Sequence, residues 1–452
     1  MPKALMWFRR DLRITDNEAL ASAIEFSSGD FLGAMIMIDD ELWPGWGNAK
    51  QHYLMNSLKS LNSDLNDSLI IRHGKPEEEV IKVAVGLGVE KVFCHKDFTR
   101  RGMARDKKVA KELQKHGIEL VTVGSIYAVE PGKVLKDDGT NYRVYTPFYK
   151  GWLKYGWTSP FSYTLPKSFL KFESHGYLDV EYPKDMTPAD GGEASALNKA
   201  NEFLKRAVVD YKDLRDRADL DGTSKLSIAL KWGEIHPRTL LARLGDSAGE
   251  EHYRKELAWR EFYADVLFHY PTSDIEYLNP AFKNMKYDSG KLADERFEAW
   301  KAGRTGYPFV DAGMRQLLKE GWMHNRVRMV TASFLVKDLH LEWQFGAEWF
   351  FNLLLDADLA SNQHGWQWTA GCGTDAAPYF RIFNPTAQGQ KFDPDGEYVR
   401  KYIPELRHID GGQVHEPWLL LDGYSKGYPE RIVDHSVERD ESLARYNAIK
   451  KS

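Results

Sequence analysis

Two carboxylates, a neutral amide and two indoles lie between residues 356 and 368 of this 452-residue chain. They are Asp356, Asp358, Asn362, Trp366 and Trp368. Carboxylates hold cationic partners, an amide donates and accepts hydrogen bonds without titrating, and indoles stack on flat rings. This mixture suits a dry pocket for a large, flat, redox-active ring.

Two arginines at positions 326 and 328 are the natural cationic partners of those carboxylates. Residues two apart cannot share a helix face, so one of Arg326 and Arg328 can point inward while the other points to solvent or phosphate. A buried arginine needs a carboxylate because a lone buried charge is very costly. We therefore expect an ion pair with Asp356 or Asp358, and a purely structural ion pair in a helical bundle is the plain alternative.

The segment 222–227, Gly-Thr-Ser-Lys-Leu-Ser, is a second group of polar residues, and it stands before the apolar residues 228–230. Small hydroxyl residues at the start of a helix offer N–H and O–H groups to an anion. An ordinary helix cap is the plain alternative. The segment is neither a Walker loop nor the glycine fingerprint of dinucleotide-binding folds.

The composition is that of a soluble globular protein with unusual aromatic content. The chain is 42% hydrophobic and 28% charged, and it has 14 tryptophans. A typical soluble chain has roughly 1% Trp, and a buried indole needs a partner for its N–H. Stacking surfaces or electron carriers are therefore expected, although a large aromatic core could hold most of these rings. The net charge of −5 does not exclude nucleic acid, because phosphate binding needs only a local basic face.

The two cysteines, Cys94 and Cys372, give no disulfide framework and no metal-ligand spacing. We expect no metal and a cytoplasmic protein. The short apolar start runs into Arg9 and Arg10, which excludes a signal peptide. No stretch approaches the roughly 18 consecutive apolar residues of a membrane span, so no membrane partner is expected.

The first third of the chain alternates short apolar segments with helical patterns. The predicted strands are 3–8, 31–39, 68–73, 91–95 and 119–123. Residues 51–65 have a helix period, and Pro76 followed by three Glu predicts a helix start. This alternation predicts an α/β domain with a doubly wound parallel sheet over residues 1–130.

Beyond residue 130 the pattern changes. Residues 131–195 are punctuated by Pro, Gly, Ser and Asp, which predicts an interdomain connector. Residues 196–452 have helical periods and little strand alternation, which predicts an all-α second domain.

The run 358–385, the segment 222–227 and the stretch Glu256-Leu257-Ala258-Trp259-Arg260-Glu261-Phe262-Tyr263 together resemble the photolyase/cryptochrome family. The resemblance covers nearly the whole chain and is densest over 211–263 and 304–406. It is closest to the bacterial members that repair cyclobutane pyrimidine dimers. It implies a light-dependent carbon–carbon lyase with a helical FAD-binding domain, in which photoexcited reduced FAD passes an electron to a flipped-out dimer in ultraviolet-damaged DNA.

The resemblance also assigns the FAD-binding residues. They would be Tyr211, Thr223, Ser224, Lys225, Leu226, Ser227, Arg328, Asp356, Asp358 and Asn362. The segment 223–227 matches the family's diphosphate loop, and the matching Arg–Asp pair lies against the flavin ring. Asn362 would stand next to N5 of the ring, where a neutral amide can accompany every redox state without adding charge. Asn at this position favours the repair branch of the family.

The lesion-binding residues are implied in the same way. They would be Arg215, Glu256, Trp259, Asn325, Arg326, Met329 and Trp368, with Lys391 a further phosphate contact. Trp259 and Trp368 would be walls on which flipped bases stack, and Glu256 would bind the thymine edge and stabilise its radical anion. For Trp259 the plain alternative is a core aromatic. Asn325 and Met329 stand where enzymes for six-four lesions have histidines, so cyclobutane dimers are the implied substrate.

The resemblance departs from the family at two places. Trp366 and Trp343 match the inner members of an electron-carrying tryptophan chain, but residues 283–289 hold no third Trp. Tyr287 is one candidate exit, and Trp300, Trp322 and Trp349 are others.

The antenna residues also differ. Gly102 and Met103 stand where folate-binding members have a carboxylate before the residues matching 104–106. This favours an 8-hydroxy-deazaflavin antenna over methenyltetrahydrofolate, or no antenna, near Trp7 and Trp43.

Two other classes of protein are weighed against repair. A signalling cryptochrome often carries a C-terminal extension, and the residues after Leu406 do not have the composition of a disordered tail. A dark flavin oxidoreductase would need a nicotinamide site, and no glycine fingerprint follows the first predicted strand. We therefore expect the repair enzyme, acting on damaged DNA as a monomer.

Overall fold

The computed structural model describes residues 2–29, 31–375 and 380–450. Contacts within the chain divide it into two compact units, each built from separate segments. Unit 1 comprises Met1–Lys184, Pro188–Val209 and Ser224–Pro271, and unit 2 comprises Asp185–Thr187, Asp210–Thr223 and Thr272–Ser452. The domains expected from the sequence, residues 1–130, 131–195 and 196–452, do not coincide with these units and remain a prediction.

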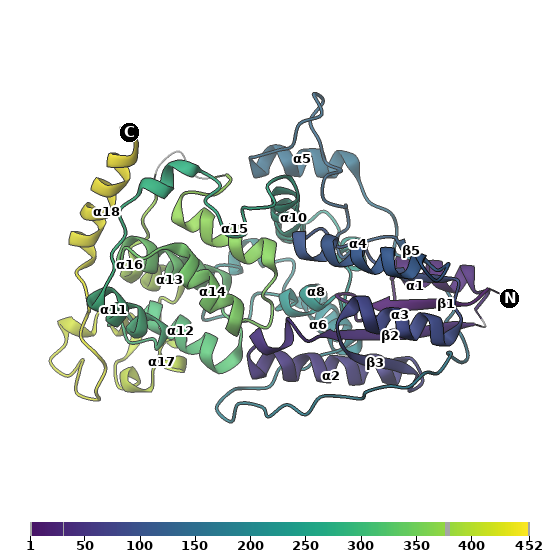
Figure 1. Ribbon diagram of the computed structural model, residues 1–452. Helices are drawn as coiled ribbons and strands as arrows, with labels where there is room; N and C mark the ends of the chain where they lie inside the picture. The colour runs from purple at the N-terminus through teal and green to yellow at the C-terminus, as the bar shows by residue number, and fades with distance from the viewer. Residues whose placement is uncertain (1, 30, 376–379, 451–452) are drawn as a thin grey trace. The chain divides into compact units, whose positions relative to one another are not determined.

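Unit 1 contains a parallel sheet of five strands in the order β3-β2-β1-β4-β5. The strands are β1 (Ala4–Phe8), β2 (Leu32–Asp39), β3 (Leu69–Gly74), β4 (Lys91–Cys94) and β5 (Glu119–Thr122). All of β1 is buried, as expected for a central strand covered on both faces. Right-handed crossovers place α1 (Glu18–Phe26) and α2 (Asn48–Asp64) on one face, with α3 (Pro76–Leu87) and α4 (Arg100–Gln114) on the other. This confirms the predicted doubly wound sheet (Figure 1).

The helix signals in unit 1 act as the sequence predicts. Pro76 is the first residue of α3 and three glutamates occupy its first turn, where anions favour the positive end of the helix. The helix ends at Gly88, whose φ of 64° is the left-handed cap that Gly adopts at least cost. The remaining helices of unit 1 are η1 (Trp43–Gly45), α5 (Tyr145–Tyr155), α6 (Glu193–Arg206), α8 (Ser227–Trp232), α9 (Pro237–Leu241) and α10 (Ala248–His269).

The described residues of unit 2 are helical and contain no strand, which agrees with the predicted all-α region. Its helices are α7 (Tyr211–Leu214), η2 (Pro280–Asn284), α11 (Lys291–Lys301), α12 (Pro308–Glu320), α13 (Asn325–Lys337), α14 (Trp343–Leu353), α15 (Leu359–Ala370), α16 (Pro385–Phe392), α17 (Glu397–Tyr402), η3 (Pro404–Leu406), η4 (Gly411–His415), η5 (Pro417–Leu419) and α18 (His435–Lys450). Helix α13 packs against α12, α14 and α15 around a core that includes Trp300, Trp343 and Trp366.

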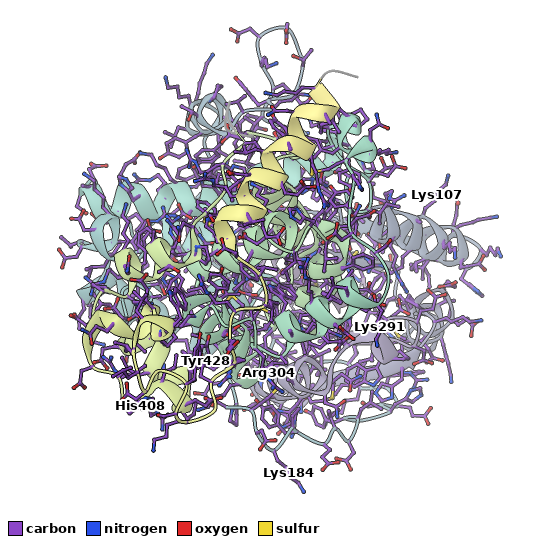
Figure 2. All side chains as sticks on the ribbon, turned by 90° about the vertical axis from the view of Figure 1, so that its left-hand side faces the viewer. Lys107, Lys184, Lys291, Arg304, His408 and Tyr428 are labelled. Carbon is purple, nitrogen blue, oxygen red and sulfur yellow. The ribbon has the colours of Figure 1, made fainter. Side chains whose placement is uncertain are left out.

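Three lysines illustrate the solvated surface outside these cores. Lys107 and Lys184 of unit 1 and Lys291 of unit 2 extend from the ribbon toward solvent (Figure 2). Among the described residues, no helix is long and apolar enough to cross a membrane.

Candidate functional site

Arg328 of α13 forms a two-point ion pair with Asp356, which lies between α14 and α15. Its Nη1 and Nη2 donate to the two carboxylate oxygens of Asp356 at 3.1 and 2.7 Å, and its Nε donates to the Met323 carbonyl at 2.7 Å. The Asp356 side chain is 2% exposed and that of Arg328 is 24% exposed. The expected inward arginine is therefore Arg328, and its partner is Asp356. A guanidinium has five N–H donors, and among the described residues only three of those of Arg328 have acceptors, so two can face an electron-rich group.

Asp358 begins α15 and ties the start of that helix. Its Oδ1 accepts a hydrogen bond at 3.0 Å from the backbone N–H of Ser361, the usual bond of an aspartate N-cap. Asn362 lies one helical turn further on, so the carboxylate and the amide are presented by adjacent turns of one helix.

The orientation of the Asn362 amide is fixed by its neighbours. Its Nδ2 donates to the Ala347 carbonyl at 3.0 Å and to Gln363 Oε1 at 2.8 Å. The Gln363 oxygen must accept here, because Gln363 Nε2 already donates to the carbonyl of Asp274 at 2.6 Å. Among the described residues, none donates to Asn362 Oδ1, so this oxygen is the free acceptor of the amide.

Trp366 packs onto α14 at a glycine. A Cβ built on Gly346 would lie 2.1 Å from Trp366 Cη2, so the indole occupies the space that any side chain at 346 would need. Trp343 is one turn before Gly346 on the same helix face, and it belongs to the same buried core as Trp366. Trp300 also contacts Trp366, in an edge-to-face arrangement with ring centroids 6.1 Å apart.

A pair of tyrosines continues from Trp343. The Tyr277 ring lies edge-on to Trp343 with centroids 6.2 Å apart, and Tyr287 stacks on Tyr277 at 6.4 Å. Tyr287 is the residue that the sequence offers as an exit for electrons. Tyr277, which links it to Trp343, was missed because nothing in its local sequence marks it.

In unit 1, the segment 224–227 leads into α8, as predicted. Ser224 Oγ accepts a hydrogen bond from the Tyr253 hydroxyl at 3.1 Å and another from the Leu226 backbone N–H at 3.3 Å. Lys225 has φ of 50°, a left-handed conformation that is uncommon outside glycine. Ser227 is the first residue of α8, and the helix is capped by Leu226 without a side-chain hydrogen bond.

Trp259 of α10 is half-buried and has an aromatic backing. The Tyr145 ring stacks on it with centroids 3.7 Å apart and planes 8° apart. This contact holds the indole in one orientation and covers one of its faces. Tyr145 starts α5, far from Trp259 in the chain, so sequence reasoning gave no sign of it. Glu256 lies one turn before Trp259 on α10.

Unit 2 holds the other predicted lesion-binding residues. Asn325 and Met329 are neighbours one turn apart on α13, with Asn325 Nδ2 3.9 Å from Met329 Sδ. Trp368 is half-buried, and its indole nitrogen is buried with no hydrogen-bond partner among the described residues. Arg215 ends α7 with its guanidinium 5.8 Å from the ring centroid of the buried Tyr211.

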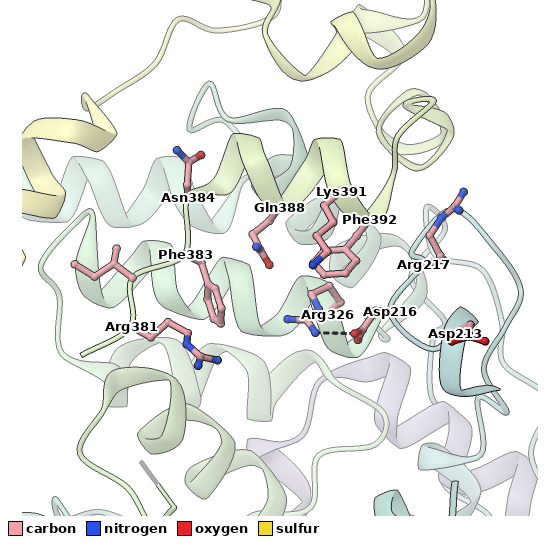
Figure 3. A pocket seen from close by; sticks show the side chains of 11 residues that line it. Asp213, Asp216, Arg217, Arg326, Arg381, Phe383, Asn384, Gln388, Lys391 and Phe392 are labelled. Atoms are coloured by element: carbon pink, nitrogen blue, oxygen red, sulfur yellow. Dashed lines mark hydrogen bonds and ion pairs between the residues drawn. The ribbon is translucent and has the colours of Figure 1, made fainter. Parts of the chain in front are cut away.

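Arg326 has a carboxylate partner of its own. Its Nη2 forms an ion pair of 2.8 Å with Asp216, and its expected contact with DNA phosphate stays a prediction. The two residues lie in a pocket of about 650 Å³, which we call the Arg326 pocket (Figure 3). Its lining residues are Asp213, Asp216, Arg217, Arg326, Arg381, Ile382, Phe383, Asn384, Gln388, Lys391 and Phe392. Asp216 follows the short helix α7 and supplies the carboxylate that a half-buried arginine requires.

His324 caps α13 and is neutral at physiological pH. Its Nδ1 accepts the backbone N–H of Arg326 at 3.2 Å, and its ring is 3% exposed. Burial lowers the pKa of His324 to about 4, with the nearby Arg328 and Arg326 acting in the same direction. At pH 7 the ring of His324 is therefore the neutral imidazole.

The chain is similar to known proteins in both sequence and structure. Residues 4–166 match the DNA photolyase family and residues 253–448 match the FAD binding domain of DNA photolyase. The chain is 37% identical to the deoxyribodipyrimidine photo-lyase of Agrobacterium fabrum, with 99% of this chain and 98% of that protein covered. It is also similar to the crystal structure of a bacterial class III photolyase from Agrobacterium tumefaciens, with a TM-score of 0.90 and 37% identity over 100% of this chain and 98% of that one. A cryptochrome from Synechocystis sp. PCC6803 is 28% identical with a TM-score of 0.87, covering 98% and 99% of the two chains.

The chain belongs to the DNA photolyase family. The family and the fold class predicted from the sequence are confirmed, and the FAD-binding domain of that family is present. The described residues hold no cluster of His, Cys, Asp and Glu that could bind a metal ion. Ala376, Ala377, Pro378 and Tyr379, which belong to the run that carried the resemblance, lie outside the described residues.

Proposed function

We propose that this chain repairs cyclobutane pyrimidine dimers in DNA with reduced FAD and blue light. The observation that carries the proposal is the meeting of α13, α14 and α15, which gathers Arg328, Asp356, Asn362 and Trp366. A cation with two spare donors, a neutral acceptor and an adjacent indole fit an electron-rich flat ring that changes redox state. The relatives named as photo-lyases at 37% identity over almost their whole length support the same function.

FAD, when bound, supplies the light-absorbing electron donor. We assign its binding to Tyr211, Thr223, Ser224, Lys225, Leu226, Ser227, Arg328, Asp356, Asp358 and Asn362. Arg328 stabilises negative charge on the ring, and Asp356 holds the guanidinium in place through both of its oxygens. The Asn362 amide can offer a ligand only its Oδ1, which is an acceptor, because both amide hydrogens are committed to Ala347 and Gln363. It therefore favours a ring nitrogen that carries a proton.

We assign lesion recognition to Arg215, Glu256, Trp259, Asn325, Arg326, Met329 and Trp368, with Lys391 as a further phosphate contact. Tyr145 keeps Trp259 rigid, which lowers the entropy lost when a base stacks on the free face of the indole. The neutral His324 agrees with a cyclobutane dimer as substrate, because splitting that ring by an electron needs no acid.

The antenna, the assembly state and the location are finer proposals. We propose 8-hydroxy-deazaflavin or no antenna. A Cβ on Gly102 would lie 2.0 Å from Cγ of Asp97, so a side chain at 102 would have to displace that carboxylate from its ion pair with Arg105. We also propose a monomer in the cytoplasm, where the two buried free cysteines, Cys94 and Cys372, would stay reduced.

The decisive test is an absorption measurement on the FAD-loaded chain with ultraviolet-damaged oligothymidine. Blue light should restore the ultraviolet absorbance of the oligonucleotide as the dimers revert to thymines, and the dark control should stay constant. A different outcome would assign the chain to signalling. In that outcome the bound FAD is reduced by light, the dimers stay intact, and the chain binds damaged and undamaged DNA equally.

A further inference from the structure

The Arg326 pocket has the lining of a base-binding site. Phe383 and Phe392 provide two aromatic rings, and the amide of Gln388 points between them in the view of Figure 3. The guanidinium of Arg326 lies 4.4 Å from the centroid of Phe392, and Asp216 holds it there through Nη2. Flat groups and an amide together are what a planar, hydrogen-bonding ring requires.

Two buried polar atoms in this pocket lack partners among the described residues. They are Gln388 Oε1, which is an acceptor, and Arg326 Nε, which is a donor. A buried polar atom without a hydrogen bond costs free energy, so a protein retains such atoms where a ligand or water completes them. A nucleobase edge presents donors and acceptors side by side and complements both atoms.

The charges around the pocket limit the ligand further. Arg381 and Lys391 supply positive charge beside the two rings, while Asp213 and Asp216 supply negative charge. Arg217 is already paired with Asp219 at 2.5 Å. A ligand with one phosphate per base suits this balance, whereas the two carboxylates disfavour a dense polyphosphate.

We propose that the Arg326 pocket binds one unstacked nucleobase of DNA, with its ring on Phe383 and its edge on Gln388 and Arg326. The volume of about 650 Å³ accommodates a nucleoside, since ligand pockets span about 300–1,000 Å³. The inference rests on the proposed function, because flipping out a dimer leaves unpaired bases opposite the lesion. The base comes from the complementary strand or from the nucleotide beside the dimer.

Binding in the dark of the FAD-loaded chain to fluorescent duplexes tests this proposal. Gln388→Ala should weaken binding to a duplex with one cyclobutane dimer roughly three- to tenfold, the value of a hydrogen bond, without changing the salt dependence. Phe383→Ala should weaken it by about tenfold or more. Gln390→Ala is the matched control, because Gln390 lies on the same helix, is exposed, and among the described residues its side chain bonds only to Glu416, at 2.9 Å.

Abasic substrates identify the base. If the loss of affinity caused by Gln388→Ala and Phe383→Ala vanishes when the duplex is abasic opposite the dimer, the base comes from the complementary strand. If it vanishes only when the nucleotide beside the dimer is abasic, the base comes from the damaged strand. Wild-type binding by both variants, or an equal loss on a duplex abasic at both places, would overturn the proposal.

An undamaged duplex with a two-base mismatch bubble separates this proposal from the repair function. It offers unstacked bases without a lesion, so Gln388→Ala should lose affinity for it even if the wild-type chain proves indifferent to dimers. Lack of dimer preference by the wild type would count against repair alone, whereas no effect of Gln388→Ala on the bubble would count against the pocket.

Discussion

At the scale of single residues, Arg328 shows how a charge is held ready beside a cofactor. Its three protein acceptors are Met323 and both oxygens of Asp356, so its position does not depend on a ligand. Pre-positioned charge needs no reorganisation when the electron moves.

Asp356→Ala should therefore lower FAD occupancy and stability together. It leaves a partly buried guanidinium without its carboxylate, which we expect to cost about 2–4 kcal/mol in unfolding free energy, somewhat less than for a fully buried pair. Asp356→Asn should have FAD occupancy and stability between those of the wild type and Asp356→Ala, because asparagine keeps an acceptor and loses the charge. Flavin absorbance per protein and urea unfolding measure both effects. The exposed Asp294→Ala is the control, and normal flavin content in Asp356→Ala would refute the assignment.

At the scale of elements, the contact between α14 and α15 depends on the absence of a side chain at Gly346. Trp366 Cη2 and Leu335 Cδ2 would lie 2.1 and 2.5 Å from a Cβ at this position. The two helices approach closely, and Trp366 and Trp343 share one buried core, so we expect electron hopping between the two indoles.

Gly346→Ala should displace the Trp366 indole and slow light-driven reduction of the bound oxidised flavin. Overpacking of this kind costs about 1–3 kcal/mol. Trp366→Phe should abolish the fast reduction and spare repair once the flavin is reduced chemically. Gly365→Ala is a matched control on α15, because a Cβ there meets nothing within 4 Å. It should raise stability by up to about 1 kcal/mol. Photoreduction of Trp366→Phe at the wild-type rate would exclude this relay.

Helix α13 also carries a buried lysine that makes stability depend on pH. Lys337 is 2% exposed, its Nζ donates to the Arg381 carbonyl, and burial lowers its pKa from 10.5 to about 7. Above pH 7, Lys337 keeps its proton in the unfolded chain and has released it in the folded chain. The unfolding free energy therefore rises with pH. Asp338, with a pKa raised by burial to about 6, titrates below this window, and burial raises the pKa of Cys372 so that its thiol stays protonated.

Lys337→Met should flatten this dependence. Between pH 7 and 8.5 the wild-type unfolding free energy should rise by up to about 1.4 kcal/mol per pH unit from this group. Urea unfolding at a series of pH values measures the slope, and Lys291→Met, at a side chain 91% exposed, should keep it. An unchanged slope in Lys337→Met would assign the effect to other groups.

At the scale of the whole molecule, a chain of net charge −5 must bind DNA through local positive charge. Affinity for damaged DNA should therefore fall with salt as phosphate contacts release counterions. Arg215→Ala should reduce the slope of log affinity against log salt by about 1 and weaken binding to all DNA.

Trp259→Ala is the contrasting variant in the same titration. It should keep the salt slope and reduce the preference for damaged over undamaged DNA, because stacking carries no net charge. A reduced slope in Trp259→Ala, or an unchanged one in Arg215→Ala, would reverse these assignments.

Much of this architecture follows from local sequence patterns. The five strands and the start of α3 at Pro76 are where apolar runs and capping residues predict them, because neighbours along the chain decide these features. The sequence also predicts a carboxylate partner for one of the two arginines of α13, Arg326 and Arg328, because an unpaired buried charge is strongly destabilising.

Only the tertiary structure decided which residues meet across the chain. It paired Arg328 with Asp356 and Arg326 with Asp216, stacked Tyr145 on Trp259, and set Trp366 on Gly346. These contacts join different elements of the chain, and their selection depends on how whole helices pack. Periodicity and spacing describe one helix at a time, so they determine which face of a helix is buried and leave open what lies against it.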